Sequence, residues 1–312
     1  MVSSLRYSIF GSLSGKAVCA LLCALNQSVQ AQQLDPRAYS NIPIGANFLT
    51  LGYSYSSGNV ALDPSLPITN VRARFQTAAL GYSRALQFNG QSGVVTLVLP
   101  YVVLSATGDV FGESMTRNVG GVGDPGVRVS ANLYGAPALS LEDYSAYRQG
   151  AIIGVSLLTT APLGQYDASK LVNIGSNRWS FKSEAGASVP IGDHWTLEGA
   201  PSVTLFTDNR RFFNGNTRSE SPLYAVQGHL IYNFKQDLWI AADGTYYAGG
   251  RTTLNGKLDD DLQRSSRWGA TLSQAVDRQN SIKLYFSKGL YARTGSQFQT
   301  IGVAWQFSWF SQ

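Results

Sequence analysis

The residues best suited to acid–base chemistry in this chain are its two histidines, His194 and His229. An acyl hydrolase needs a serine activated by a histidine, which a polar partner holds in the right orientation. His194 falls in an expected turn, and His229 lies on an expected strand, on the same face as Gln227 and Asn233. No G-x-S-x-G elbow occurs after residue 31. The pattern favours a hydrogen-bonded structural histidine at position 229 and leaves an acyl hydrolase as the alternative.

Two short motifs suggest ligands, but neither has the surroundings that its ligand needs. The run Gly121-Val-Gly-Asp-Pro-Gly126 fits G-x-G-x-x-G, which binds a dinucleotide only between a strand and a helix. Here Val127-Arg-Val-Ser130 follows and is typical of a strand, so the run is expected to be a turn. Asp259-Asp-Asp261 lacks the spaced oxygen ligands of a calcium loop and is expected to be a solvated charge run. We therefore expect no cofactor and no metal.

The stretch that indicates the architecture is the C-terminal one, Phe298–Phe310. Apolar and mostly aromatic residues alternate there with small or polar ones, which is the pattern of a strand with one oily face. A transmembrane barrel ends in this way, with aromatic side chains at the level of the lipid headgroups and a polar lumen face. The apolar residues of the stretch are Ile301, Val303, Trp305, Phe307 and Trp309.

The first 31 residues are expected to be a cleavable signal peptide. Arg6 and Lys16 precede a short apolar run, and Val29-Gln-Ala31 supplies the small residues of a cleavage site. Both cysteines, Cys19 and Cys23, lie in this segment, so disulfides and thiolate chemistry are excluded from the mature chain. Residues 32–46 are expected to be a periplasmic leader, and residues 47–312 a single barrel domain.

The composition favours a barrel over a soluble enzyme. Charged residues make up 14% of the chain, below the roughly 25% of an ordinary soluble domain. Without the signal peptide 22 basic and 19 acidic residues remain, a balance that gives no reason to expect a nucleic-acid partner. After residue 31 no apolar run approaches the ~20 residues of a membrane helix.

The alternation and turn residues predict an all-β, antiparallel up-and-down transmembrane barrel of about 12 strands. Short turns alternate with long loops for most of the chain, which is typical of outer-membrane barrels with both termini in the periplasm. Residues 106–125 are expected to be a long polar loop, and 135–148 is longer than the other short turns. The expected strands are 47–56, 71–86, 92–105, 126–134, 149–160, 178–189, 195–208, 222–234, 238–249, 265–276, 281–291 and 298–310.

The same alternation assigns faces to the side chains. Charged groups at membrane depth belong in a lumen, because a lipid-facing charge is costly, and both signs are present, which favours uncharged or weakly charged solutes. The expected pore-lining residues are Arg74, Arg128, Lys182, Glu184, Glu198, His229, Asp243, Arg267 and Lys283. The aromatic residues expected at the two membrane interfaces are Trp179, Trp195, Tyr232, Trp239, Trp268, Trp305 and Trp309.

With the strands placed, the chain resembles the outer-membrane barrel family named for the meta-pathway of phenol degradation. The likeness rests on Gly121–Gly126, Ala161-Pro-Leu-Gly-Gln-Tyr-Asp167, Ile174-Gly-Ser-Asn-Arg-Trp179 and the C-terminal strands from Arg267. It implies a transporter of aromatic or other hydrophobic compounds, and it brings no catalytic residue with it.

The sequence thus predicts an outer-membrane channel for passive passage of small aromatic or hydrophobic solutes. Alternatives are a lipid-modifying barrel enzyme, with a Ser/His pair on its outer wall, and a blocked barrel whose loops serve adhesion or assembly. A soluble sandwich is a more distant alternative. Expected partners are the solute, outer-membrane lipid or lipopolysaccharide, and the barrel assembly machinery through the C-terminal strand, with no nucleic acid. The arginines Arg210, Arg211 and Arg218 are candidates for contact with lipopolysaccharide phosphates.

Overall fold

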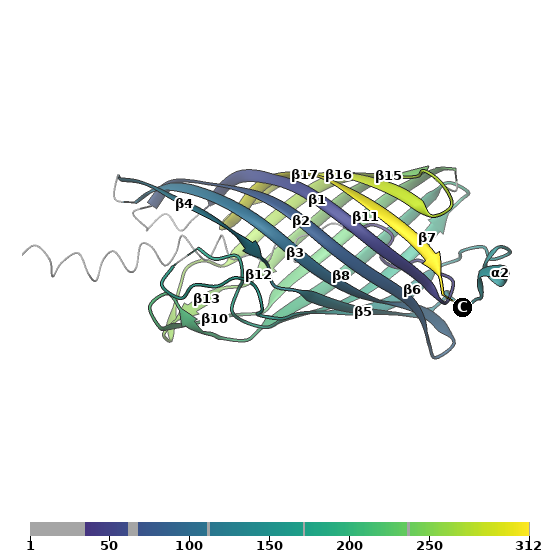
Figure 1. The fold of residues 1–312 in the computed structure, drawn as a ribbon, viewed down its shortest axis with the longest axis horizontal. Coiled ribbons are helices and arrows are strands. Elements are labelled where there is room, and N and C mark those ends of the chain that lie inside the picture. Colours follow the sequence, from purple (N-terminus) through teal and green to yellow (C-terminus); the bar gives the residue numbers. More distant parts are fainter. Residues whose placement is uncertain (1–34, 62–67, 111–112, 171, 236–237, 312) are drawn as a thin grey trace, which may run out of the picture.

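The computed structural model describes residues 35–61, 68–110, 113–170, 172–235 and 238–311. They form a closed antiparallel barrel of 12 strand positions, which confirms the predicted fold class (Figure 1). Thirteen strands fill these positions, because β4 and β5 lie end to end along β3. The wall strands are β1 (Ala46–Ala61), β2 (Ile68–Phe88), β3 (Gln91–Val110), β4 (Glu113–Val122), β5 (Gly126–Tyr134), β6 (Ile152–Thr160), β7 (Ser180–Ile191), β8 (Trp195–Phe206), β11 (Leu223–Lys235), β12 (Leu238–Gly249), β15 (Gln263–Ala275), β16 (Asn280–Ala292) and β17 (Gly295–Phe310).

The first and last strands close the barrel. β1 pairs with β17 from Ala46 opposite Phe310 to Ala61 opposite Gly295. Closure leaves few backbone N–H and C=O groups without a partner, which a wall surrounded by hydrocarbon requires. Short turns gather at the end that carries the C-terminus, and long connections gather at the other (Figure 1). We call these the short-turn end and the long-loop end.

The turn at Asn89-Gly90 shows how the sequence sets the register. Both residues have positive φ, 47° and 78°, as a two-residue hairpin turn between twisted strands demands. The turn fixes β2 against β3 from Phe88 opposite Gln91 onward, so every second side chain of these strands faces the lumen.

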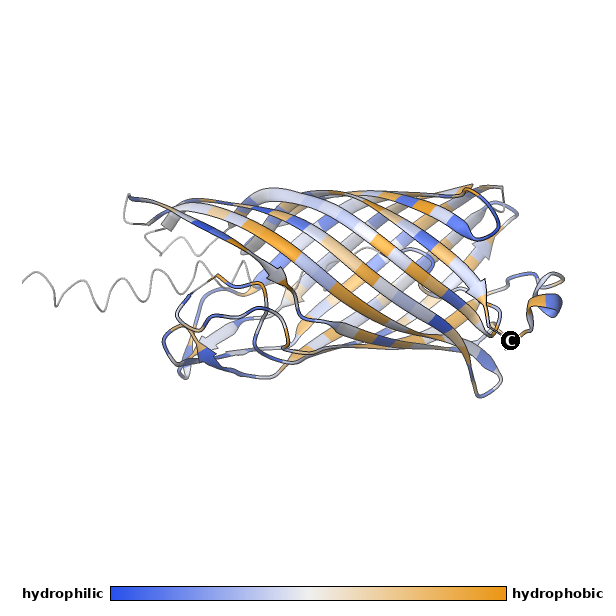
Figure 2. Cartoon of the chain, viewed as in Figure 1, coloured by the Kyte–Doolittle hydropathy of each residue, from blue (hydrophilic) through white to orange (hydrophobic). Residues whose placement is uncertain are grey.

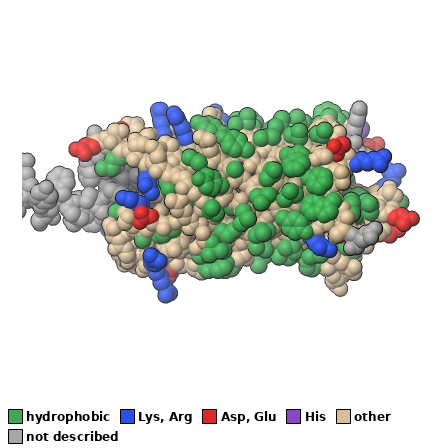
Figure 3. All heavy atoms as spheres, viewed as in Figure 1, with side chains coloured by type: hydrophobic (Ala, Val, Ile, Leu, Met, Phe, Trp, Pro, Cys, Tyr) green, Lys and Arg blue, Asp and Glu red, His purple; other side chains and the backbone are tan. Residues whose placement is uncertain are grey.

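An apolar band lies between more polar ends on the face seen in Figures 2 and 3, and exposed apolar side chains occur on the strands all round the sheet. On β17 the outward residues Ile301, Val303 and Trp305 are 63%, 41% and 37% exposed, whereas Gly302 between them is buried. The predicted facing of the C-terminal strand is therefore confirmed. In the part of the chain that the structure describes, no helix has the length and apolarity needed to span a bilayer.

The prediction of a long loop at 106–125 was wrong. Instead β3 continues to Val110 and returns as β4, with Tyr101 opposite Val122 and Val110 opposite Glu113. The hairpin is polar and rich in glycine because it lies beyond the apolar band, where no oily face is needed to hold a strand. The break between β4 and β5 is confined to residues 123–125.

Two loops at the long-loop end form a small sheet of their own. It consists of β9 (Asn209–Phe212), β10 (Asn216–Glu220), β13 (Thr252–Leu254) and β14 (Lys257–Leu258), in the order β14-β13-β10-β9. Asp261 binds this sheet through the N–H and hydroxyl of Thr252, and burial together with the Asp261 carboxylate raises the pKa of Asp259. The aspartates 259–261 thus take part in loop folding.

The connection after β5, longer than its neighbours as expected, folds over the short-turn end. It contains one short helix, α2 (Leu141–Tyr144), whose N-cap Ser140 accepts a hydrogen bond from the backbone of Asp143. The Tyr144 hydroxyl donates to the backbone oxygen of Asn41 at 3.0 Å. Burial raises the pKa of Tyr144, against the effect of nearby Arg37, so the phenol remains a proton donor.

Candidate functional site

The inner wall carries the charged residues that we expected to line the lumen, with one exception. Those that lie on the inner face are Arg128, Lys182, Glu184, Glu198, His229, Asp243, Arg267 and Lys283. Arg74 was placed wrongly, because its neighbours Ala73 and Phe75 are buried inside and it is exposed on the outer face. Strand β2 extends beyond the apolar band at this point. The rule that a charge avoids the lipid-facing side therefore does not apply to Arg74.

Glu184 on β7 is the centre of the charge network in the lumen. Its carboxylate lies 3.2 Å from the guanidinium of Arg128 and 3.0 Å from Lys182 Nζ. It also accepts hydrogen bonds from the Tyr39 hydroxyl at 3.0 Å and from Gln227 Nε2 at 3.1 Å. With four partners and a side chain only 2% exposed, this carboxylate is compensated in charge and in hydrogen bonds, as a buried ion must be.

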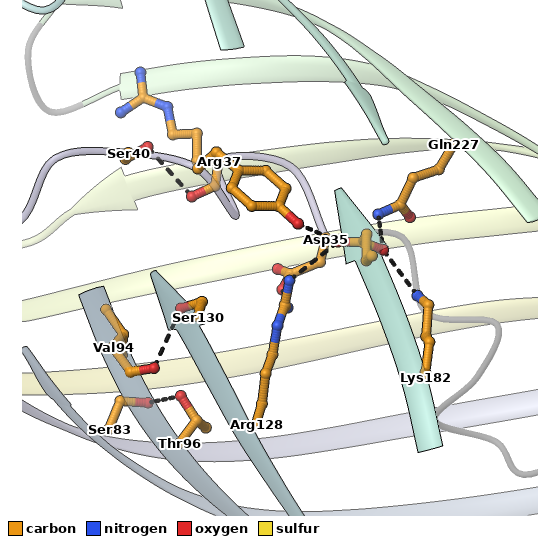
Figure 4. A network of polar contacts seen from close by, with 12 residues as sticks. Asp35, Arg37, Ser40, Ser83, Val94, Thr96, Arg128, Ser130, Lys182 and Gln227 are labelled. Atoms are coloured by element: carbon orange, nitrogen blue, oxygen red, sulfur yellow. Dashed lines mark hydrogen bonds and ion pairs between the residues drawn. The ribbon is translucent and has the colours of Figure 1, made fainter. Parts of the chain in front are cut away.

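A segment of the chain that precedes β1 completes this network from inside the barrel. Asp35 lies 3.1 Å from Arg128 and 3.9 Å from Lys283, which come from separate parts of the wall, β5 and β16. Figure 4 shows Asp35 among Arg128, Lys182 and Gln227. The expected signal peptide, 1–31, lies outside the described residues. The described part of the expected periplasmic leader, residues 35–45, lies against the inner wall.

Arg37 anchors the same segment to another part of the wall. Its backbone N–H donates to Glu198 at 2.7 Å, and its side chain donates to Asn233. Its guanidinium also lies 4.9 Å from the ring centre of Trp239. Trp239 is 7% exposed and packs inward with Ile231, so its predicted place at the lipid interface was wrong.

Tyr39 occupies a space that two glycines leave open. A Cβ on Gly186 would lie 2.1 Å from the Tyr39 ring, and one on Gly154 would lie 2.6 Å from it. The two glycines are opposite each other on β7 and β6. The tyrosine is 3% exposed. The absence of side chains at these two positions is therefore what lets the segment lie flat on the wall.

His229 belongs to the inner wall as well. Its Nδ1 lies 2.6 Å from Asp243 Oδ1, and Thr271 donates to the other oxygen of that carboxylate at 2.9 Å. Its Nε2 is buried and has no hydrogen-bond partner among the described residues. A lipid hydrolase requires its histidine beside a serine on the outer wall, whereas this imidazole faces the lumen and is oriented by Asp243.

An apolar cluster fills the lumen at the long-loop end. Phe75 and Phe298 meet edge to face at 5.4 Å, and Leu104, which is 1% exposed, belongs to the same cluster. Val172 and Phe212 reach the cluster from two loops. The sequence pattern did not reveal this cluster, because β3 is apolar on both faces and the loop residues have no periodicity.

The three loop segments that carry the family resemblance meet around Asp124. One of its oxygens accepts a hydrogen bond from the backbone of Gly164 at 2.8 Å, and the other accepts from the backbone and the hydroxyl of Ser176 at 2.7 and 2.6 Å. A Cβ on Gly121 would lie 1.6 Å from Gln165, so these chains touch directly. We call this group the Asp124 clasp. The expected turn at 121–126 is thus the place where the wall strand breaks.

The Asp124 clasp covers an edge of the sheet. β4 pairs only with β3, and Gln165 donates to the backbone oxygen of Val122 at 2.8 Å beside that edge. An uncovered edge next to the membrane leaves backbone groups without partners. The loop therefore covers this edge at Val122, the last residue of β4.

Replacing Asp124 by alanine is expected to release the loop 161–177. Three hydrogen bonds to a carboxylate are lost, and each contributes about 1.5–3 kcal/mol. We expect protease cleavage within this loop to become at least tenfold faster, while the barrel itself stays folded. Asp193→Ala, in the short turn after β7, is the matched control, and an equal cleavage rate in both variants would show that the clasp does not hold the loop.

Aromatic side chains mark both limits of the apolar band. On the outer face Trp179, Trp195, Trp268 and Trp305 are between 37% and 44% exposed. Tyr232 packs at 4.8 Å on Trp195, and Trp309 stacks at 5.7 Å on Phe307. Rings of this kind at the two interfaces are a feature of membrane barrels.

A closed antiparallel barrel with an apolar outer band, aromatic limits and a charged interior defines an outer-membrane β-barrel. The model of the family described as "Putative MetA-pathway of phenol degradation" matches residues 55–307. The chain belongs to this family, which confirms the resemblance seen in the sequence.

Solved structures show the same fold. An outer membrane channel from Pseudomonas putida F1 matches with a TM-score of 0.77 and 18% identity over 89% of this chain and 100% of that one. The transport unit of the autotransporter AIDA-I from Escherichia coli matches with a TM-score of 0.54 and 7% identity, over 95% and 98% of the two chains. No curated protein matches the sequence.

Proposed function

We propose that this protein is a passive outer-membrane channel for small hydrophobic solutes, aromatic ones among them. The observation that carries the proposal is the division of the lumen into two parts. An apolar cluster with Phe75 and Phe298 lies at the long-loop end, and a charged wall around Glu184 lies deeper. A solute with an aromatic body would contact this apolar part on its way through the lumen.

The charged wall supports uncharged or weakly charged solutes. Positive and negative groups alternate around Glu184, with Arg128 and Lys182 beside it and Asp35 nearby. Strong ion selectivity comes from rings of one sign, which this wall lacks in the described residues. The proposal rests on the pore-lining residues that were predicted from the sequence, with the exception of Arg74. The Pseudomonas putida homologue of the same fold is an outer membrane channel, which agrees with this role.

Export and assembly are part of the same proposal. The first 31 residues would direct the chain across the inner membrane, and the aromatic C-terminal strand would be the segment that the barrel assembly machinery binds. Residues 35–39 contact the inner wall, so we expect the segment 35–45 to narrow the lumen and the unmodified protein to have a low conductance. A barrel that inserts and stays silent would favour the alternative of a non-conducting barrel with binding loops.

The first experiment is single-channel recording of the refolded protein in a planar bilayer, with and without phenol or a methylated phenol. Discrete current steps that the solute interrupts would support the proposal. Steps that no aromatic solute alters would contradict the solute class.

Replacing Phe298 by alanine is expected to weaken the apparent affinity for the phenolic solute about tenfold. A buried phenylalanine contributes about 1.5–3 kcal/mol of apolar contact, and about 1.4 kcal/mol corresponds to a factor of ten. Phe286→Ala is the matched control, because Phe286 lies on the neighbouring strand β16 and packs on Trp268 outside the barrel. Equal affinities in the two variants would show that the apolar cluster does not contact the solute.

A further inference from the structure

Cations gather on the outer face of the barrel at the long-loop end, where no sequence motif marks them. On β2, Arg72 and Arg74 are exposed, whereas Val71, Ala73 and Phe75 between and beside them are buried. Because successive side chains of a strand point to opposite faces, both guanidinium groups lie on the outside of the wall.

Two further cations lie on the same side of the barrel. Lys288 on β16 is exposed opposite Trp268, and Arg264 lies two outward positions beyond that tryptophan on β15. The strands β2, β1, β17, β16 and β15 are consecutive neighbours in the sheet, so the four residues belong to one sector of the wall. We call Arg72, Arg74, Arg264 and Lys288 the rim cations.

The register places the rim cations at the level of lipid headgroups. Tyr55, an outward aromatic residue, lies opposite Gln76, and the next outward pair is Ser57 with Arg74. Two residues of a tilted strand advance about 5 Å along the membrane normal. Arg74 therefore lies about 5 Å beyond the aromatic limit of the apolar band, and Arg72 about 10 Å beyond it.

The rim cations are not neutralised by ion pairs, and the Asp109 carboxylate on the neighbouring strand β3 accepts a hydrogen bond from Asn70 instead. Within the part of the chain that the structure describes, none of the four makes an ion pair. The outward residues on the strands between them are uncharged; they are Ser57, Asn59, Gln297 and Gln299. The four positive charges next to an oily surface thus form a site for an anion that is itself attached to acyl chains.

We propose that the rim cations bind the phosphorylated headgroup of a glycolipid in the outer leaflet. A guanidinium presents paired N–H donors that match a phosphate, and Arg72 and Arg74 offer two such groups side by side on one face of β2. The acyl chains of the same lipid would lie on the apolar band below, against Tyr53 and Ile301. The site rests on the outer-membrane location of the barrel and is independent of what passes through the lumen.

The test is binding of diphosphorylated lipid A to the full barrel in a neutral detergent, measured by native mass spectrometry across a titration. The variant carries Arg72→Gln and Arg74→Gln together. Because each cation near an anionic lipid surface contributes about fivefold in affinity, we expect the affinity to fall about twenty-five-fold. Lipid A without its phosphates is expected to bind the wild-type barrel more weakly than intact lipid A binds the variant, because Arg264 and Lys288 remain in the variant.

Arg84→Gln is the matched control, since Arg84 is also exposed on the outer face of β2 but lies near the short-turn end, opposite Asn47. Equal losses in the variant and this control, or equal binding of lipid A with and without phosphate, would overturn the proposal. If the double variant does not fold, Arg264→Gln with Lys288→Gln tests the same site. Single-channel conductance is expected to be unchanged in these variants, which separates this site from the proposed channel function.

Discussion

Single-channel conductance is expected to rise severalfold when Gly186 is replaced by valine. The segment 35–45 lies on the inner wall because the Tyr39 ring occupies the space above Gly186 and Gly154. A Cβ at position 186 would lie 2.1 Å from that ring, far inside van der Waals contact. The tyrosine is displaced, and its hydrogen bond to Glu184 is lost with it.

The displaced segment has other anchors, which set the size of the effect. Asp35 remains near Arg128 and Lys283, and Arg37 remains bonded to Glu198. The two Asp35 contacts join partly exposed charges and contribute about 0–1 kcal/mol each, and the Arg37 N–H bond to the buried Glu198 carboxylate contributes about 1.5–3 kcal/mol. They cannot hold the segment against a steric overlap with the wall, so its middle leaves the lumen and the ion path widens.

Ala187→Val is the matched control for this experiment. It adds a similar side chain at the next position of β7, but on the outer face, where only lipid meets it. Planar-bilayer recordings of both variants decide the question. If Gly186→Val conducts no better than Ala187→Val, the segment is not what limits the current.

The strands of this barrel were predictable because their pattern is local. β5 and β12 begin and end where the alternation predicted, at Gly126–Tyr134 and Leu238–Gly249. A strand that faces lipid on one side and a polar lumen on the other must alternate at every position. Where that constraint ends, as in the polar hairpin of β3 and β4, the prediction of a loop was wrong.

Facing errors have the same origin. Arg74 was expected on an inward position of its strand, where a charge avoids lipid, and Trp239 was expected at a membrane interface because its ring is aromatic. In the structure Arg74 lies beyond the apolar band and faces outward, and Trp239 faces inward beneath Arg37. Residue type predicts facing only at membrane depth, and depth is a property of the closed barrel.

The interior segment and the Asp124 clasp could not be predicted from one sequence. Tyr39 lies 145 positions from Glu184, and Asp124 lies 40 and 52 positions from Gly164 and Ser176. No periodicity links such residues, because their contact depends on how the loops fold back over the wall. The glycines at 154 and 186 were visible, but their purpose depends on a ring from another part of the chain.

Replacing Glu184 by glutamine is expected to lower the free energy of unfolding by about 3 kcal/mol, the lower part of the range for breaking a buried ion pair. Glutamine keeps the shape, but Tyr39 and Gln227 donate to different oxygens of Glu184 and glutamine has only one. The change therefore removes the charge together with one of these two hydrogen bonds. Arg128 and Lys182 lose a carboxylate that each contacts. Equilibrium unfolding in urea of the barrel in lipid or detergent measures the loss.

The effect on ion flow provides an independent readout of the same change. One negative charge leaves the lumen wall, so the reversal potential in a salt gradient is expected to shift toward anions. Glu142→Gln is the matched control, because Glu142 lies exposed on α2, away from the wall strands. Adding Lys182→Gln to Glu184→Gln removes the uncompensated cation and is expected to restore part of the stability. If Glu184→Gln and Glu142→Gln unfold at the same urea concentration, the Glu184 charge does not stabilise the barrel, and the docking of Tyr39 depends on packing against Gly154 and Gly186.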